Sequence, residues 1–261
     1  MTSLRACSRP WLIGVLHLPA LPGAPGAAIP IEDVARHAVE DALILQDLGF
    51  TALMVENFHD VPFPAGDAAP ETIASMAVVA RAVGEAIRIP LGIQVLRNDA
   101  LASLGIAVAS GASFLRVNVL AGATVTDQGL IQGKADVLLR RRKALGADVM
   151  ILADVDVKHA TSLDRRPLTQ RAVDLATRSG ADAILVTGNT TGDPVDLEEL
   201  SAVSAAVDPV PVLAASGTTP DTLRATLGRC AGTIVGSALR EKESERINQI
   251  RAATYAERIP R

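Results

Sequence analysis

The chain alternates eight times between a short apolar run and a longer segment with helical periodicity. Such alternation is typical of α/β proteins in which each parallel strand is followed by a helix that covers the sheet. The runs expected to form strands are Leu12–His17, Ala52–Glu56, Leu91–Val95, Ser113–Val119, Val149–Leu152, Ala183–Thr187, Val210–Ala214 and Gly232–Val235. Eight such units in 261 residues predict one domain, residues 1–261, that folds as a parallel eight-stranded (β/α)8 TIM barrel.

Glycine and proline mark the ends of the predicted helices. Gly49, Gly111 and Gly180 each follow a helical segment, and Pro70 suits a first helical turn. The predicted helices are Ile31–Leu48, Glu71–Arg88, Asp99–Ser110, Ala135–Leu145, Thr169–Arg178, Asp196–Ala206, Pro220–Leu227 and a last one near Glu243–Arg258. A doubly wound open sheet is the alternative fold, but HLPALPG follows the first strand where that fold expects GxGxxG.

Charge and cysteine content exclude several classes of protein. The formal net charge is −4, which argues against nucleic-acid binding because that function needs a basic surface. Cys7 and Cys230 are too few for a disulfide framework, so the reducing cytoplasm is the expected location. No apolar run reaches the roughly 18 residues that a membrane helix requires, so no transmembrane segment is expected. Barrels of this class often pair, and we therefore expect a homo-oligomer.

Polar side chains follow the early strands at the points where they end. In a (β/α)8 barrel the carboxyl ends of the strands carry the active site, so these residues are candidates for chemistry. The fifth strand continues into Asp154, Asp156, Lys158 and His159. The candidate catalytic residues are His17, Glu56, Asp99, Asp154, Lys158 and His159, and the candidate substrate-binding residues are Asn57, Arg97, Asn98, Arg116, Asn118 and Asp127.

The fourth strand, FLRVNV, alternates polar and apolar residues. A period of two places Arg116 and Asn118 on one face, which we predict to be the barrel interior because the other face must meet the helices. A structural ion pair of Arg116 with Glu56 or Asp154 is the alternative to a role in substrate binding.

The last three loops, VTGNTTG, AASGTTP and IVGSALR, are rich in glycine and nearly free of charge. Such loops present backbone N–H groups to an anion, and the loops after strands seven and eight are the usual phosphate position of the barrel. The candidate phosphate-binding residues are Gly188, Ser216, Gly217, Thr218, Gly236 and Ser237. The ligand expected from this pattern is a phosphorylated small molecule.

Two mechanisms fit these residues. In the first, Glu56, Asp154, His17 and His159 act as general acid and base on a sugar phosphate, and the same groups could hold a divalent metal. In the second, Lys158 forms a Schiff base with a carbonyl substrate. We rank the second lower because Lys158 lies beyond the expected strand end, where an amine of lowered pKa is harder to arrange.

Several motifs together resemble the BtpA/SgcQ family over about residues 12–240. They are HLPALPG, VENFHDVPF, LGIQVLRNDA, FLRVNV, TDQGLIQG, ADVDVKHA, VTGNTTG, SGTTP and IVGSALR, in the family's order. Gln132 stands where the family commonly has glutamate, and the tail REKESERINQ departs from its usual pattern.

The resemblance implies a barrel similar to the ribulose-phosphate-binding barrels. It also leaves two alternatives to an enzyme. The family name comes from a cyanobacterial member needed for photosystem I accumulation, which implies an assembly factor for a membrane complex. A barrel that senses a sugar phosphate without turnover is the other alternative.

Overall fold

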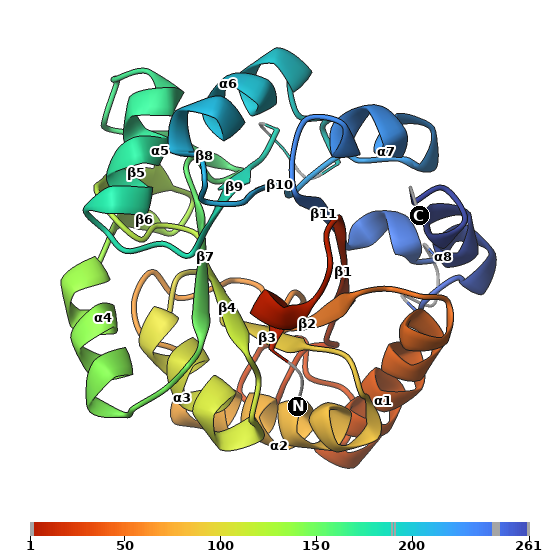
Figure 1. Ribbon diagram of the computed structural model, residues 1–261. Coiled ribbons are helices and arrows are strands. Elements are labelled where there is room, and N and C mark those ends of the chain that lie inside the picture. Colours follow the sequence, from red (N-terminus) through yellow and green to blue (C-terminus); the bar gives the residue numbers. More distant parts are fainter. Residues whose placement is uncertain (1–2, 189, 191, 242–245, 260–261) are drawn as a thin grey trace.

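The computed structural model describes residues 3–188, 190, 192–241 and 246–259. Eight parallel strands close into a barrel in the order β1-β11-β10-β9-β7-β4-β3-β2, with the helices around it (Figure 1). The barrel strands are β1 (Trp11–His17), β2 (Ala52–Glu56), β3 (Leu91–Gln94), β4 (Phe114–Val117), β7 (Met150–Asp154), β9 (Ala183–Val186), β10 (Val212–Ala214) and β11 (Gly232–Val235). The predicted (β/α)8 barrel is therefore confirmed.

The helices of the outer ring begin and end close to the predicted positions. They are α1 (Ile31–Asp47), α2 (Pro70–Ala86), α3 (Ala100–Ser110), α4 (Ala135–Ala144), α5 (Leu168–Thr177), α6 (Leu197–Val207), α7 (Pro220–Leu227) and α8 (Gln249–Ala256), with short 3-10 turns at η1 (Leu4–Ala6) and η2 (Ser237–Leu239). The last helix is shorter than predicted, because the chain first forms a bridge between Arg240 and Ile247. Part of the predicted helix, residues 243–245, lies outside the described residues.

Alternate residues of the barrel strands fill the interior. Trp11, Ile13 and Val15 of β1 pack with Met54, Phe114, Met150, Leu152 and other inward side chains into one apolar cluster. Phe114 fits only because the neighbouring strand carries glycine: a Cβ on Gly92 would lie 2.1 Å from the Phe114 ring. A separate, larger cluster lies between the strands and the helices.

The same alternation fixes the residues at the carboxyl end of the barrel. Continuing the inward positions by two residues leads to His17, Glu56, Gln94, Arg116 and Asp154, all of which are buried. The apolar interior therefore ends in a layer of polar side chains, and this layer forms the floor of the candidate site.

One part of the fold differs from the sequence-based expectation. The loops after β4 and β7 contain a three-stranded antiparallel sheet of β5 (Ala123–Thr126), β6 (Gly129–Gln132) and β8 (Ala160–Ser162), which Figure 1 shows beside α5. The strands have only three or four residues each, too few for a periodic signal in the sequence. Ile131 of β6 packs with Val119 and Val157, which follow β4 and β7, and these contacts attach the sheet to the carboxyl end of the barrel.

Within the described ranges, no helix is both long enough and apolar enough to span a bilayer.

Candidate functional site

A cavity of about 330 Å³ opens at the carboxyl end of the barrel. It is bordered by polar residues of the early strands and by the glycine-rich loops after β10 and β11, as the sequence predicts for a single site. The predicted site residues that line it are His17, Glu56, Arg97, Arg116, Asn118, Lys158, His159, Ser216, Gly217, Thr218, Gly236 and Ser237.

His17 connects the two sides of this cavity. Its ring stacks on Phe58, with the centroids 4.0 Å apart and 8° between the planes. Its Nε2 lies 3.9 Å from Oε2 of Glu56 and 2.8 Å from the position that a Cβ on Gly236 would take. Burial, and then the nearby charge of Arg240, lower the pKa of His17 well below its ordinary value, so the ring is neutral near pH 7.

Glu56 is a buried carboxylate that faces the cavity. Among the residues that the structure describes, no group donates a hydrogen bond to its side chain, and only 7% of the residue is exposed. Burial raises the pKa of Glu56 because it disfavours the charged form, and Arg116 and Lys158 only partly oppose that effect. A carboxylate in this environment is a stronger base than one exposed to water.

Asp154 lies deeper and is occupied by hydrogen bonds. It accepts two from Arg116, at 3.0 Å from Nε and 2.8 Å from Nη2, and a third from Nδ2 of Asn118 at 2.8 Å. The structural ion pair that the sequence left open is thus formed with Asp154, and the predicted inward orientation of Arg116 and Asn118 is observed. Asp154 positions these two side chains and does not line the cavity itself.

Gln94 is a site residue that the sequence analysis missed. It is 2% exposed and lines the cavity, where its Nε2 donates to Oδ1 of Asn118 at 3.2 Å. Its Oε1 is buried and has no hydrogen-bond partner within the described ranges. Its inward orientation could have been predicted, because it lies two residues after Gly92, which faces the interior of the barrel from β3.

Lys158 and His159 enter the cavity from the loop after β7. Arg97 holds this loop, because its Nη2 donates to the carbonyl oxygen of Lys158. Burial, and then the charge of Arg116, lower the pKa of the Lys158 amine. The pKa of the Lys158 amine is thus lowered although the residue lies beyond the end of β7, which differs from the sequence-based expectation.

The loops after β10 and β11 carry the candidate phosphate site. The N–H groups of Gly217, Thr218, Ser237 and Ala238 donate to no other group within the described residues. Gly217 has a φ of +60°, and a Cβ there would lie 2.1 Å from the carbonyl oxygen of Asp193, so glycine is required for the close packing of these loops.

Gly188 and Ser216 join neighbouring loops. The Oγ of Ser216 accepts a hydrogen bond from the N–H of Gly188 at 2.6 Å and donates one to the carbonyl oxygen of Asp193 at 3.0 Å. Gly188 does not line the cavity, and its N–H is occupied by this bond. The neighbouring residues Asn189 and Thr191 of the VTGNTTG loop lie outside the described residues.

The structure places the other predicted site residues away from the cavity. Asn57 accepts from the N–H of Leu96 and donates to Asp60, and Asn98 pairs with the N–H and carbonyl of Val119. These two side chains join neighbouring loops. Asp127 is exposed in the turn between β5 and β6.

Asp99 is the N-cap of α3 and accepts hydrogen bonds from Ala102 and Ala68. We expect Asp99→Ala to lower the free energy of unfolding by about 1–3 kcal/mol, because it removes a helix cap and leaves the N–H of Ala68 unsatisfied. Urea denaturation measures the effect, and Asp196→Ala, which removes only a cap on α6, is the matched control. Unchanged stability together with lost ligand binding would instead support the catalytic role predicted from the sequence.

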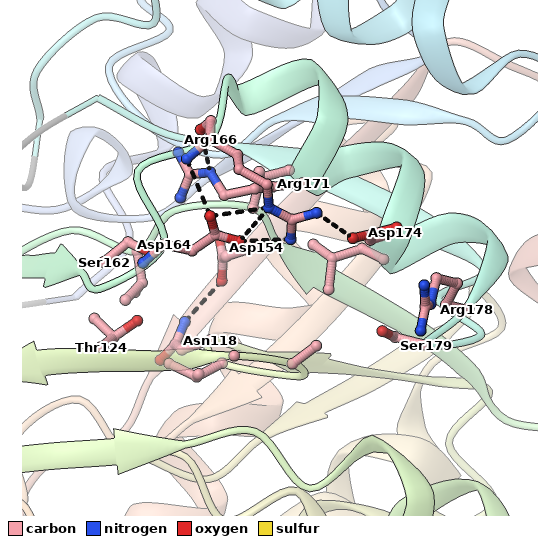
Figure 2. Close-up of a pocket in the computed structure, with 16 residues that line it drawn as sticks. Asn118, Thr124, Asp154, Ser162, Asp164, Arg166, Arg171, Asp174, Arg178 and Ser179 are labelled. Atoms are coloured by element: carbon pink, nitrogen blue, oxygen red, sulfur yellow. Dashed lines mark hydrogen bonds and ion pairs between the residues drawn. The ribbon is translucent and has the colours of Figure 1, made fainter.

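A second cavity, of about 380 Å³, lies beside the first and shares Asn118 and Val157 with it. Figure 2 shows Asn118 directed at Asp154. In the same cavity Arg166 contacts Asp164 at 2.6 Å and Asp174 at 2.8 Å. Arg171 is paired with Asp156 by two hydrogen bonds of 2.6 Å. Both of these arginines are paired with carboxylates, and Arg178 is a third arginine in the lining of this cavity.

The described part of the chain does not gather three His, Cys, Asp or Glu side chains around any point that could hold a metal. At the main cavity, His17 and Glu56 are neighbouring groups of this kind. A divalent metal there would take its remaining ligands from water or from a substrate phosphate, as Mg²⁺ commonly does.

The chain is similar in sequence to the members of one protein family. The model of the BtpA family matches residues 8–261. An uncharacterised protein of Pyrococcus abyssi is 44% identical, covering 88% of this chain and 87% of its own length. The Photosystem I biogenesis protein BtpA of Synechocystis sp. is 40% identical, covering 94% of this chain and 86% of its own length.

Solved structures are similar at lower identity. Phosphoribosyl anthranilate isomerase from Thermus thermophilus has a TM-score of 0.58 at 16% identity, covering 95% of this chain and 98% of its own. Tryptophan synthase from M. tuberculosis has a TM-score of 0.59 at 19% identity, covering 97% of this chain and 93% of its own. At these identities the similarity concerns the fold alone.

Proposed function

The chain belongs to the BtpA family, and we propose that it is an enzyme that transfers a proton on a phosphorylated small molecule, of the sugar-phosphate or nucleoside type. One observation carries this proposal. The pair of Glu56 and His17 borders the same cavity as Gly217 and Ser237, whose N–H groups meet no acceptor in the described part of the chain. Binding of the phosphate to the loops would hold the rest of the molecule over the carboxylate.

Glu56 is the proposed general base. Its carboxylate has no competing hydrogen-bond donor among the described residues, and its raised pKa brings it closer to the working pH. Neutral His17, 3.9 Å away, can pass a proton to or from the substrate. Lys158 and Arg97 supply positive charge for an oxygen that becomes negative during the reaction.

The names of two similar proteins bear on this proposal. Phosphoribosyl anthranilate isomerase, which shares the fold, is named for a phosphorylated ribosyl compound. The Synechocystis relative is named for photosystem I biogenesis. An assembly role does not by itself account for a buried carboxylate that borders a cavity and accepts no hydrogen bond within the described residues, and we therefore favour an enzyme. We further propose that the protein acts in the cytoplasm as a homo-oligomer, with Cys7 and Cys230 as free thiols.

A thermal-shift screen over phosphorylated sugars and nucleotides, with and without MgCl2, tests the proposed site. A ligand present at 100 times its Kd is expected to stabilise the protein by about 2.7 kcal/mol. Ser237→Asp should abolish that shift because it places a negative charge beside the phosphate. Ser8→Asp makes the same change before β1, at the opposite end of the barrel, and should retain the shift.

The proposal of a phosphate site is wrong if no phosphorylated compound raises the melting temperature. It is also wrong if a ligand raises the melting temperature of Ser237→Asp as much as that of the parent protein. Borohydride added with the stabilising ligand separates the two mechanisms. A covalent mass gain at Lys158 would favour the Schiff base, whereas general acid and base catalysis by Glu56 and His17 expects none.

A further inference from the structure

Ring side chains concentrate at the main cavity. The chain has four Phe, one Trp, one Tyr and four His, ten rings in all, and five of them line this cavity. The five are His17, Phe58, His59, Phe63 and His159. The other two phenylalanines, Phe50 and Phe114, are buried in the apolar clusters. In a chain with so few rings, this distribution indicates a site for a flat, apolar group.

The loop after β2 supplies three of these rings. Phe58 stacks on His17, and His59 meets Phe58 edge-on, with centroids 5.1 Å apart and planes at 82°. Further along this loop, Phe63 is partly exposed and Val61 is 58% exposed, and both border the cavity. Apolar side chains gathered at a cavity mouth are typical of a surface that a ligand covers.

Phe58 and Phe63, which we call the aromatic wall, lie next to the proposed phosphate site. The face of the His17 ring meets Phe58, and the edge of the same ring approaches Gly236 in the loop after β11. One ligand can therefore contact the loop after β2 and the glycine-rich loops together. The volume of about 330 Å³ is at the lower end of the range for small-molecule sites.

A buried polar atom also points to a ligand. Oε1 of Gln94 has no hydrogen-bond partner among the residues that the structure describes, although the residue is 98% buried at the floor of the cavity. Leaving a buried acceptor unsatisfied is costly, so a ligand hydroxyl or N–H group is the expected donor. A sugar hydroxyl or a ring N–H group would satisfy it.

We propose that the phosphorylated ligand carries a planar aromatic ring, such as a nucleobase, that packs against Phe58 and Phe63. This inference rests on the proposed function for the position of the phosphate. It narrows the proposed substrate class from phosphorylated sugars in general to sugar phosphates that carry an aromatic ring.

Isothermal titration with four probes tests the inference: AMP, UMP, ribose 5-phosphate and uridine. At least one of the two nucleotides is expected to bind about 5- to 150-fold more tightly than ribose 5-phosphate, the range that stacking of a base on an aromatic side chain gives. Uridine, which has the ring but no phosphate, is expected to bind more weakly than UMP.

Phe63→Ala is expected to weaken binding of the preferred nucleotide by the same factor and to leave ribose 5-phosphate unchanged. Phe63→Tyr should restore most of the affinity because it keeps the ring. Leu130→Ala on β6 is the matched control, since Leu130 is 53% exposed and lies outside the cavity. It should change neither affinity.

The two proposals fail in different ways. If ribose 5-phosphate binds as tightly as both nucleotides, or if Phe63→Ala weakens both kinds of ligand equally, the aromatic site is wrong and the phosphate site remains. If uridine binds as tightly as UMP, the phosphate site is wrong and the ring site remains. If no probe binds, both are wrong.

Discussion

Asp154→Ala is expected to lower the free energy of unfolding by about 3–5 kcal/mol, the cost of leaving a buried charge without its partner. Arg116 is 6% exposed, and the Asp154 side chain is fully buried. The guanidinium of Arg116 and the amide of Asn118 both donate hydrogen bonds to this carboxylate, and removing it deprives both groups of that acceptor. Urea denaturation with a fitted m-value measures the change.

A double variant tests the cause of that loss. Arg116→Met combined with Asp154→Leu removes both charges and is expected to recover most of the lost stability, because an apolar pair of similar volume replaces a buried ion pair at little cost. Glu85→Ala breaks the exposed pair with Arg81 and should change stability by less than about 1 kcal/mol. If Asp154→Ala alone costs no more than Glu85→Ala, the pair does not hold the barrel end together.

The strands and the position of the cavity could be predicted because each depends on local pattern. Apolar runs fix the barrel strands, and a parallel barrel brings the carboxyl ends of all strands to one rim. The inward positions of Arg116 and Asn118 followed from the period of two along β4. For the same reason, the polar ends of the early strands and the glycine-rich loops were expected at the same end of the barrel.

The roles of individual polar residues could not be predicted in the same way. Asp99, Asn57 and Asn98 have the residue types and positions of catalytic groups, but their hydrogen bonds cap α3 and join neighbouring loops. A residue that binds substrate and one that fixes a loop look alike in sequence. The difference lies in the tertiary partner, which the sequence pattern does not contain.

The small sheet and the aromatic wall were missed for a related reason. Strands β5, β6 and β8 are too short to show a period, and their pairing joins segments that lie after two different barrel strands. Phe58 and Phe63 were part of a loop without periodicity. Only the fold brings them to the same cavity as His17 and Gly236.

Glu56→Gln is expected to reduce turnover of the substrate found in the ligand screen by about 10²- to 10⁴-fold, the usual contribution of a general base. The amide keeps nearly the same size but cannot accept a proton at neutral pH. Substrate affinity should change little, since the phosphate contacts are made by the loops after β10 and β11. Steady-state kinetics with separate kcat and KM values checks this, and an unchanged kcat would remove Glu56 from the mechanism.

The effect of Glu56→Gln on stability can be predicted and measured without a substrate. The pKa of Glu56 is raised in the folded protein above its ordinary value of 4.5, so the folded state holds the proton more tightly than the unfolded state does. The stability that this proton provides is present below pH 4.5 and is lost as the pH rises through the raised pKa. Relative to the wild type, Glu56→Gln should therefore gain stability as the pH rises from 4 to 8.

The gain should be about 1.4 kcal/mol for each pH unit that separates the two pKa values. Glu85→Gln alters an exposed carboxyl and should show no such trend. A catalytic carboxylate held in a destabilising environment explains both results at once, because the burial that makes Glu56 a better base also makes its charged form costly. If Glu56→Gln is less stable than the wild type across this pH range, Glu56 serves the fold and not the reaction.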